Sequence, residues 1–320
     1  MAGADGATQR DLEQLTGLVA AGRVLVLSGA GMSTGSGIPD YRGPTGALRR
    51  HTPMTYQEFI GDREARRRYW ARGFVGWRQV AAARPNPAHE AVAALQERGL
   101  VGTVVTQNVD GLHQAAGSPL VVELHGALDR VVCLDCGALL PRAQLDRRLR
   151  AANAEFDARA AELVAGRQVN PDGDVELPED VVRCFQVVPC PVCEGGVLKP
   201  DVVFFGESVP RERVRRCFDL LASARSLLVL GSSLTVMSGY RFVRAAAKAG
   251  QPVAVVNAGA TRGDGEASLK VDAPLAPTLQ AVLAALDGSG AEGGGAVEGG
   301  EAVEGGRGVG RPGRGAVLAG

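Results

Sequence analysis

LSGAGMSTGSGIPDYRG, residues Leu27 to Gly43, follows the apolar run Val24 to Leu27 and is rich in glycine, serine and threonine. Gly29 and Gly31 come directly after this run, where small residues permit a tight turn and bring backbone amides close to a phosphate. The dinucleotide fingerprint G-x-G-x-x-G has its third glycine where this chain has Thr34. The stretch alone therefore leaves two interpretations open, a phosphate-binding loop and a glycine-rich turn of any α/β protein.

Further short apolar runs follow along the chain, and helical periodicity separates most of them. They lie at residues 104–106, 121–124, 227–231 and 253–257. Continuous apolar runs are typical of strands buried on both faces, and their alternation with helices favours a parallel sheet. A helix over residues 9–21, with Thr8 and Gly22 as caps, precedes the first strand.

Two insertions and a tail interrupt this α/β pattern. We predict a Rossmann-like domain with two insertions, one forming a helical module and the other a zinc-binding module. The tail consists mostly of glycine, alanine, glutamate and arginine and buries too little apolar surface to fold, so we predict that it is disordered. The predicted limits are 1–43, 85–130 and 200–286 for the Rossmann-like domain, 44–84 and 131–199 for the two modules, and 287–320 for the tail.

The composition is that of a globular protein. The 320 residues are 45% hydrophobic and 22% charged, and the formal net charge is zero, which gives no reason to expect nucleic acid or an anionic membrane as a partner. No segment reaches the roughly 18 apolar residues of a membrane span, and the first residues contain no signal-peptide pattern. We therefore expect a cytoplasmic protein.

Four of the six cysteines form two pairs, Cys133-x-x-Cys136 and Cys190-x-x-Cys193. In a reducing compartment such pairs favour a metal over a disulfide, and four thiolates suit tetrahedral zinc. Because the four thiolates leave no coordination position open for water, we interpret the zinc as structural. The long interval between the pairs requires the intervening insert to fold back.

Polar side chains follow two of the predicted strands. TQNVDGLHQAAG contains Gln107, Asn108 and Asp110, and ELHG contains His125. Because the carboxyl ends of parallel strands meet at a ligand crevice, these side chains are expected to converge there. Imidazole accepts a proton near neutral pH, whereas a lone histidine is more often structural. His113 is a second candidate for a base, but we interpret it as a packing or hydrogen-bonding residue.

The ordered set of motifs over residues 9 to 285 resembles the sirtuin (Sir2-type) family of NAD-dependent protein deacylases, most closely its class II branch. It comprises GAGMSTGSGIPDYRG, PNPAH, TQNVDGLHQAAG, ELHG, the two cysteine pairs, KPDVVFFGE, GSSL and VVN. The resemblance implies that NAD is consumed, that nicotinamide is released and that the acyl group of an acyl-lysine protein or peptide passes to ADP-ribose. It also implies one structural zinc ion.

The resemblance assigns roles to individual residues. It makes His125 the general base, and Asn108 and Asp110 the groups that position the ribose and the nicotinamide carboxamide. The NAD contacts that it implies are Gly29, Ala30, Gly31, Asp40, Tyr41, Arg42, Gln107, Asn108, Asp110, Gly231, Ser232, Ser233, Asn257 and, near the adenine, Leu275. Substrate peptide is expected to add as a strand between Val203–Gly206 and the segment around Ser238 and Gly239.

Several activities remain open on the sequence alone. The desuccinylase branch has a Tyr-x-x-Arg pair, whereas this chain has Tyr56-Gln-Glu-Phe59, which argues against succinyl-lysine but does not separate acetyl from lipoyl or other long acyl groups. Protein mono-ADP-ribosyl transfer and lipoamidase activity would use the same NAD site. A nucleotide-binding module without turnover is a further alternative, which the presence of His125, Asn108 and Asp110 disfavours.

Overall fold

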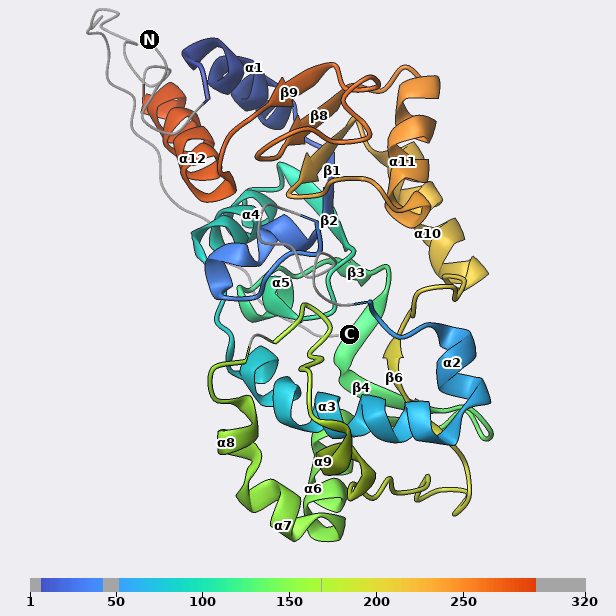
Figure 1. Cartoon of the computed structure of the whole chain (residues 1–320). Helices are drawn as coiled ribbons and strands as arrows, with labels where there is room; N and C mark the ends of the chain where they lie inside the picture. Colours follow the sequence, from blue (N-terminus) through green and yellow to red (C-terminus); the bar gives the residue numbers. More distant parts are fainter. Residues whose placement is uncertain (1–6, 43–51, 168, 292–320) are drawn as a thin grey trace, which may run out of the picture.

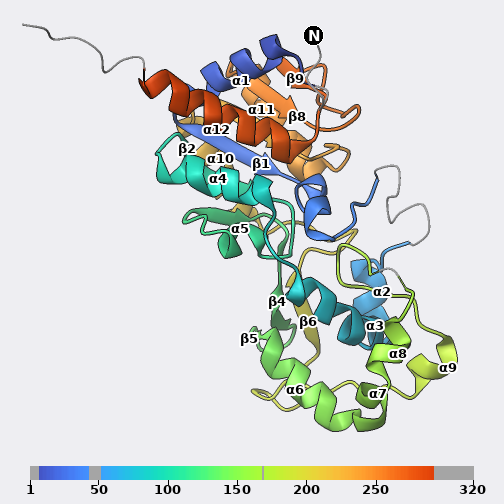
Figure 2. The ribbon, with the colours of Figure 1, turned by 90° about the vertical axis from the view of Figure 1, so that its left-hand side faces the viewer.

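The computed structural model describes residues 7–42, 52–167 and 169–291, and these form two lobes joined by several crossing segments (Figure 1). The larger lobe contains a six-stranded sheet with helices on both faces, and the smaller lobe contains a three-stranded sheet with helices from two insertions (Figure 2). This confirms the predicted α/β fold class. No helix in the described ranges is both long and apolar enough to cross a membrane.

The large sheet is parallel throughout, in the order β3-β2-β1-β7-β8-β9. Its strands are β1 (Val24–Ser28), β2 (Val101–Thr106), β3 (Val121–Glu123), β7 (Ser226–Leu230), β8 (Val253–Val256) and β9 (Leu269–Val271). The first five confirm the predicted runs. The sequence analysis missed β9, because three residues with a central lysine give no apolar run. Strand order reverses between β1 and β7, and ligands bind at such switch points.

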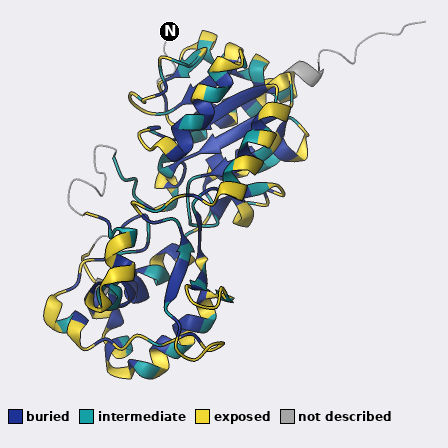
Figure 3. Ribbon diagram, turned by 90° about the vertical axis from the view of Figure 1, so that its right-hand side faces the viewer, coloured by how far each residue is buried: buried dark blue, intermediate teal, exposed yellow. Residues whose placement is uncertain are grey.

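Helices pack on both faces of this sheet. They are α1 (Gln9–Ala20), α4 (Pro87–Glu97), α5 (Leu112–Ala115), α10 (Arg211–Ser223), α11 (Met237–Lys248) and α12 (Leu275–Ala291). Side chains of α1, α4 and α12 pack with Val24 and Val26 on one face, while those of α10 and α11 pack with Leu25 and Leu27 on the other. The alternate residues of β1 are therefore buried on both sides, as its unbroken apolar run predicts (Figure 3).

Helices α1 and α12 are the first and the last helix of the large lobe. Thr8 caps α1 through a reciprocal bond with Asp11, as predicted, and Gly22 follows the C-cap in a left-handed conformation, with φ of 71°. At the other end, the expectation of disorder from residue 287 is wrong for residues 287–291, which continue α12. Asp287 forms an ion pair of 2.8 Å with Arg98. Residues 292–320 lie outside the described part.

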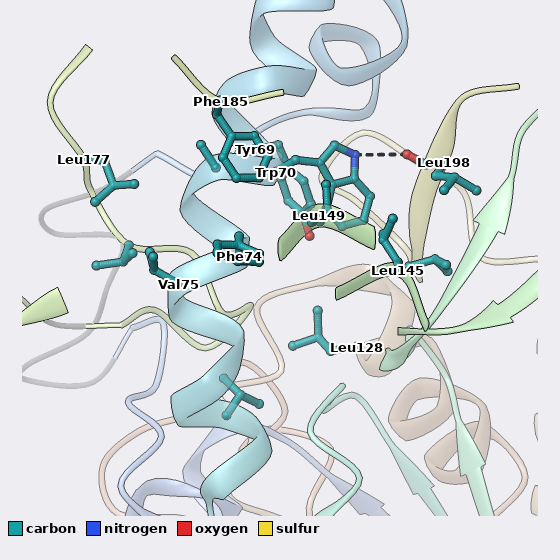
Figure 4. Packing of buried hydrophobic residues seen from close by; sticks show 14 of the residues in the cluster. Tyr69, Trp70, Phe74, Val75, Leu128, Leu145, Leu149, Leu177, Phe185 and Leu198 are labelled. Carbon is teal, nitrogen blue, oxygen red and sulfur yellow. Dashed lines mark hydrogen bonds between the residues drawn. The ribbon is translucent and has the colours of Figure 1, made fainter. Parts of the chain in front are cut away.

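The smaller lobe is built from both insertions. Its sheet has the order β5-β4-β6 and consists of β4 (Gly126–Cys133), β5 (Leu139–Pro141) and β6 (Leu198–Val202). Its helices are α2 (Tyr56–Gly61), α3 (Arg63–Ala82), α6 (Arg142–Ala152), α7 (Ala154–Ala158), α8 (Ala160–Val164) and α9 (Glu179–Arg183). The aromatic residues of helix α3, which belongs to the first insertion, pack against the second insertion, residues 131–199 (Figure 4). Trp70 anchors α3 to β6, because its indole nitrogen donates to the carbonyl oxygen of Leu198 at 3.1 Å.

Arg142 is a buried cation in the core of this lobe. The residue is 1% exposed. Its guanidinium donates to the carbonyl oxygen of Gly73 at 2.7 Å and lies 5.1 Å and 5.3 Å from the ring centroids of Trp70 and Trp77. A guanidinium is more weakly hydrated than an ammonium and stacks on aromatic faces, which suits it to such a site. Arg142 thus joins the start of α6 to the middle of α3.

We expect Arg142→Ala to lower the free energy of unfolding of the protein by about 2 to 4 kcal/mol, because it removes a buried hydrogen bond and two cation–π contacts and leaves a cavity. Urea unfolding followed by tryptophan fluorescence measures this change. Arg147→Ala removes an exposed arginine from the same helix and serves as the control. Equal unfolding midpoints for the two variants would contradict a stabilising role for Arg142.

Candidate functional site

Two loops cross in direct backbone contact at the switch point between β1 and β7. The amide of Gly31 donates to the carbonyl oxygen of Gly231 at 2.8 Å. A Cβ atom on Gly29 would lie 2.7 Å from the Cβ of Ser232, and one on Gly31 would lie 2.9 Å from the oxygen of Gly231. Gly231 itself has φ of +60°. The glycines are therefore required by packing between the loops, which is a reason that the sequence pattern alone did not reveal.

A cleft of about 1290 Å³ opens between the lobes at this crossing. Nearly all of the predicted NAD contacts line it, from four separate loops of the large lobe. They are Gly29, Ala30, Gly31, Asp40, Tyr41, Arg42, Gln107, Asn108, Asp110, Gly231, Ser232, Ser233 and Asn257. Leu275 is not among the described residues that line the cleft; its δ-carbon lies 2.8 Å from where a side chain on Gly231 would begin. The structure therefore brings together all of the predicted contacts except Leu275.

His125 lies in the turn between β3 and β4, and it lines the cleft. Its Nδ1 is 2.9 Å from the carbonyl oxygen of Gln107, and its Nε2 is 2.8 Å from the hydroxyl of Ser238. Burial lowers the pKa of His125 to about 4, and the nearby cations Arg213 and Arg241 act in the same direction. His125 is thus a neutral imidazole near pH 7, which is the form that accepts a proton.

Asn108 and Asp110 are held in place by the glycine loop. The side-chain amide of Asn108 donates to the carbonyl oxygen of Gly29 and to the hydroxyl of Ser33, both at 3.0 Å. Ser33 in turn donates to Asp110 at 2.7 Å. Burial raises the pKa of Asp110, and its bonds with the amide of Leu112 and with Ser33 oppose the rise. Ser33 was missed as a site residue, because only the fold brings it beside the second loop.

A second buried histidine supports these loops from behind. His113 Nε2 is 2.9 Å from the hydroxyl of Ser28 at the end of β1, and Ser28 donates to Thr106 at the end of β2, also at 2.9 Å. The ring of His113 lies edge-on to that of His89, with the two centroids 5.0 Å apart. The local role predicted for His113 is confirmed.

The four paired cysteines meet in the smaller lobe. Their sulfur atoms all lie within 4.8 Å of one another. Cys133 Sγ is 3.7 Å from Cys193 Sγ, and Cys136 Sγ is 3.9 Å from Cys190 Sγ. Zinc–sulfur bonds of about 2.3 Å in a tetrahedron place sulfurs roughly 3.8 Å apart, so the cluster fits one zinc ion. The insert folds back as the spacing requires, and all four predicted ligands are together.

A model of the Sir2 family matches residues 29–238, which is more than half of the 320 residues. The chain belongs to the Sir2 family. Gly29, Gly31 and His125 of this sirtuin all lie inside the matched segment.

Curated relatives and solved structures cover most of this Sir2 chain. A Streptomyces coelicolor protein named "NAD-dependent protein deacetylase 1" is 62% identical over 85% of this chain and 89% of its own length. A Bordetella bronchiseptica "NAD-dependent protein deacetylase" is 50% identical over 85% of this chain and 97% of its own. A structure described as "Sir2-p53 peptide-NAD+" has a TM-score of 0.67 at 28% identity, covering 86% of this chain and 98% of that one.

The sirtuin cleft also contains residues from the insertions that the sequence analysis did not single out. Asp172 and Asp174, from the insert between the cysteine pairs, line it together with Tyr69 and Arg72 of α3. Arg72 and Asp174 approach to 3.8 Å. The insert therefore reaches the candidate site. Nothing in its residue pattern indicated this, because the contact joins segments that are distant in sequence.

Gly196 provides a test of the zinc site. A Cβ atom there would lie 2.4 Å from Cys133 Sγ and 2.7 Å from Cys193 Sγ. We expect Gly196→Ala to displace the ligands and to weaken zinc binding by at least about tenfold, measured by chelator competition. At the neighbouring Gly195 the nearest atom is 4.0 Å away. Gly195→Ala is therefore the matched control, and equal zinc affinity in both variants would contradict this geometry.

Proposed function

We propose that the protein is an NAD-dependent protein-lysine deacetylase, which releases nicotinamide and transfers the acyl group to ADP-ribose. The observation that carries the proposal is the placement of a neutral histidine, His125, beside Asn108 and Asp110 in one cleft that also contains the glycine loop. Two relatives of high identity are named as NAD-dependent protein deacetylases. We further propose acyl-lysine proteins or peptides as substrates and the cytoplasm as the location.

The cleft fits NAD in its shape and its donor set. Gly29, Ala30 and Gly31 would lie against the pyrophosphate, because all three line the cleft and none carries a bulky side chain. Ser232 and Ser233 offer hydroxyls from the facing loop, and these residues line the same cleft. Bound NAD supplies an electrophilic anomeric carbon with nicotinamide as the leaving group.

Residues of the second loop would orient the nicotinamide end. Asn108 and Asp110 are fixed by Ser33 and the glycine loop, so they would hold hydroxyl and carboxamide groups without a large loss of side-chain entropy. Tyr41 lies edge-on to Phe205 across the cleft, with ring centroids 6.1 Å apart. This contact would let the segment Asp40–Arg42 cover the nicotinamide end and exclude water.

His125 would act as the general base. With the proton of the neutral ring on Nδ1, directed at the carbonyl oxygen of Gln107, Nε2 has the free lone pair. After the acyl-lysine carbonyl oxygen has bonded to the anomeric carbon and the bond to nicotinamide has broken, that atom would take a proton from a ribose hydroxyl, whose oxygen then bonds to the acyl carbon. Addition of water and loss of the lysine amine would leave the acyl group as an ester of ADP-ribose. The structural zinc would act only on the fold, because all of its positions are filled by cysteines.

The substrate strand would pair with the segment that follows β6. The amide of Val203 is bound to the carbonyl oxygen of His125, and the carbonyl oxygen of Phe205 accepts from Tyr56, at 2.8 Å and 2.9 Å. The segment is thereby held beside His125, and it lines the same cleft as Met237 and Ser238. Phe59, the position that lacks the arginine of desuccinylases, is buried in the core of the smaller lobe. This position argues against succinyl-lysine, and two relatives named as deacetylases support acetyl-lysine, which we propose as the main substrate.

Incubation with NAD and acetyl-lysine peptides tests the proposal. We expect nicotinamide, deacetylated peptide and O-acetyl-ADP-ribose in equal amounts by mass spectrometry, and a loss of at least about a thousandfold in His125→Ala, because the base contributes that order of rate acceleration. ADP-ribose attached to protein, without deacetylation of any peptide, would instead support the transferase alternative. Retained deacetylation in His125→Ala would exclude this base.

The lowered pKa of His125 makes a second prediction. A general base works in its unprotonated form, so activity falls as pH drops through the pKa of the base. Because that pKa is about 4 instead of the ordinary 6.5, we expect kcat/KM to show no inflection near pH 6.5 and to decline only below roughly pH 5. A pH profile at constant ionic strength measures this. An acid limb centred at the ordinary histidine pKa would contradict the environment described for His125.

A further inference from the structure

Ser238 lies at the start of α11, in hydrogen-bond contact with His125. The two residues are 113 positions apart in the sequence, and Ser238 Oγ is 2.8 Å from His125 Nε2. Only 8% of the surface of Ser238 is exposed, although both residues line the cleft. A buried hydroxyl therefore occupies the nitrogen that is expected to take the proton.

The direction of this hydrogen bond follows from the opposite side of the ring. His125 Nδ1 faces the carbonyl oxygen of Gln107, which can only accept, so Nδ1 carries the proton of the neutral ring. Nε2 then has a lone pair and no hydrogen. Ser238 must accordingly be the donor in its contact with Nε2.

Gln107 contacts both the ring of His125 and the helix that carries Ser238. Its carbonyl oxygen binds Nδ1, and its side-chain amide donates to the carbonyl oxygen of Ser28 at 3.2 Å and to Ser232 Oγ at 2.9 Å. A Cβ atom on Gly239 would lie 2.6 Å from Gln107 Oε1, so the first turn of α11 packs directly on this residue. The position of Ser238 is thereby tied to the residue that also orients His125.

We propose that Ser238 is a positioning residue for His125, an inference that rests on the deacetylase function proposed above. Its hydroxyl holds the ring in the Nδ1–H tautomer, with Nε2 directed into the cleft, until a substrate hydroxyl takes its place. Because Nε2 has a single lone pair, it accepts from one hydroxyl at a time. The ring is then already oriented when the substrate arrives, which removes a rotation from the catalytic step.

The first test measures the ring itself in the zinc-loaded protein without NAD. The chain has four histidines, so ¹⁵N spectra can resolve the two nitrogens of His125. We expect Ser238→Ala to raise the pKa of His125, because a donor to Nε2 favours the neutral form, and to reduce the excess of the Nδ1–H tautomer. Arg213 and Arg241, the charged groups that act on this ring, are unchanged in the variant.

The second test separates chemical steps. Ser238→Ala should lower kcat for deacetylation by about tenfold, the effect of one net hydrogen bond, while KM for the peptide changes little. Exchange of labelled nicotinamide into NAD, which precedes use of the base, should be retained. Ser238→Thr keeps the hydroxyl and should restore most of the rate. Ser223→Ala removes an exposed hydroxyl at the end of α10 and is the matched control.

Each outcome bears on the proposal. If the pKa and the tautomer of His125 are unchanged in Ser238→Ala, the proposal is overturned. It is also overturned if nicotinamide exchange and deacetylation fall in parallel and the KM for the peptide rises, because these results would place Ser238 in peptide binding alone. If the wild-type protein deacetylates no peptide, the proposed function fails, and the spectra still decide whether Ser238 orients the ring. A shifted pKa together with a selective loss of kcat would support it.

Discussion

The contact between the loops after β1 and β7 is the constraint on which the rest of the site depends. Gly31 and Gly231 bond through their backbones, and no side chain fits between them. Because this crossing lies where the strand order reverses, both loops open toward the same cleft. A β-carbon on either glycine would separate the loops, and with them the groups expected to bind the two ends of NAD.

The smaller lobe connects its metal site with the catalytic centre through one strand. Strand β4 begins directly after His125 and ends at Cys133. It pairs with β6, which starts at Leu198 and leads into the segment expected to bind substrate. The zinc cluster fixes the far end of both strands, while the bond between Val203 and His125 fixes the near end. A zinc ion held by the four cysteines would thereby limit the position of His125, which it does not touch.

Two histidines of this protein show how environment separates a structural role from a chemical one. Burial lowers the pKa of His113 to about 3 and that of His125 to about 4. His113 is enclosed between Ser28 and the ring of His89, so no substrate can reach it. His125 lines the cleft, and its Nε2 contacts the hydroxyl of Ser238. Access to the lone pair, and not the pKa, distinguishes them.

The sequence by itself determined the parallel sheet and the grouping of the four cysteines, because buried strands and cysteine spacing are local signals. The expected NAD contacts came from the resemblance of its ordered motifs to a family, and thirteen of those fourteen residues line the cleft. The limit at residue 286 was wrong, since Asp287 and Arg98 meet only after folding. Tertiary structure alone decided that Ser33 holds Asp110, that Ser238 reaches His125 and that Asp174 enters the cleft. These contacts join distant segments, and their distances are set by how loops and lobes pack, which no local pattern of residues encodes.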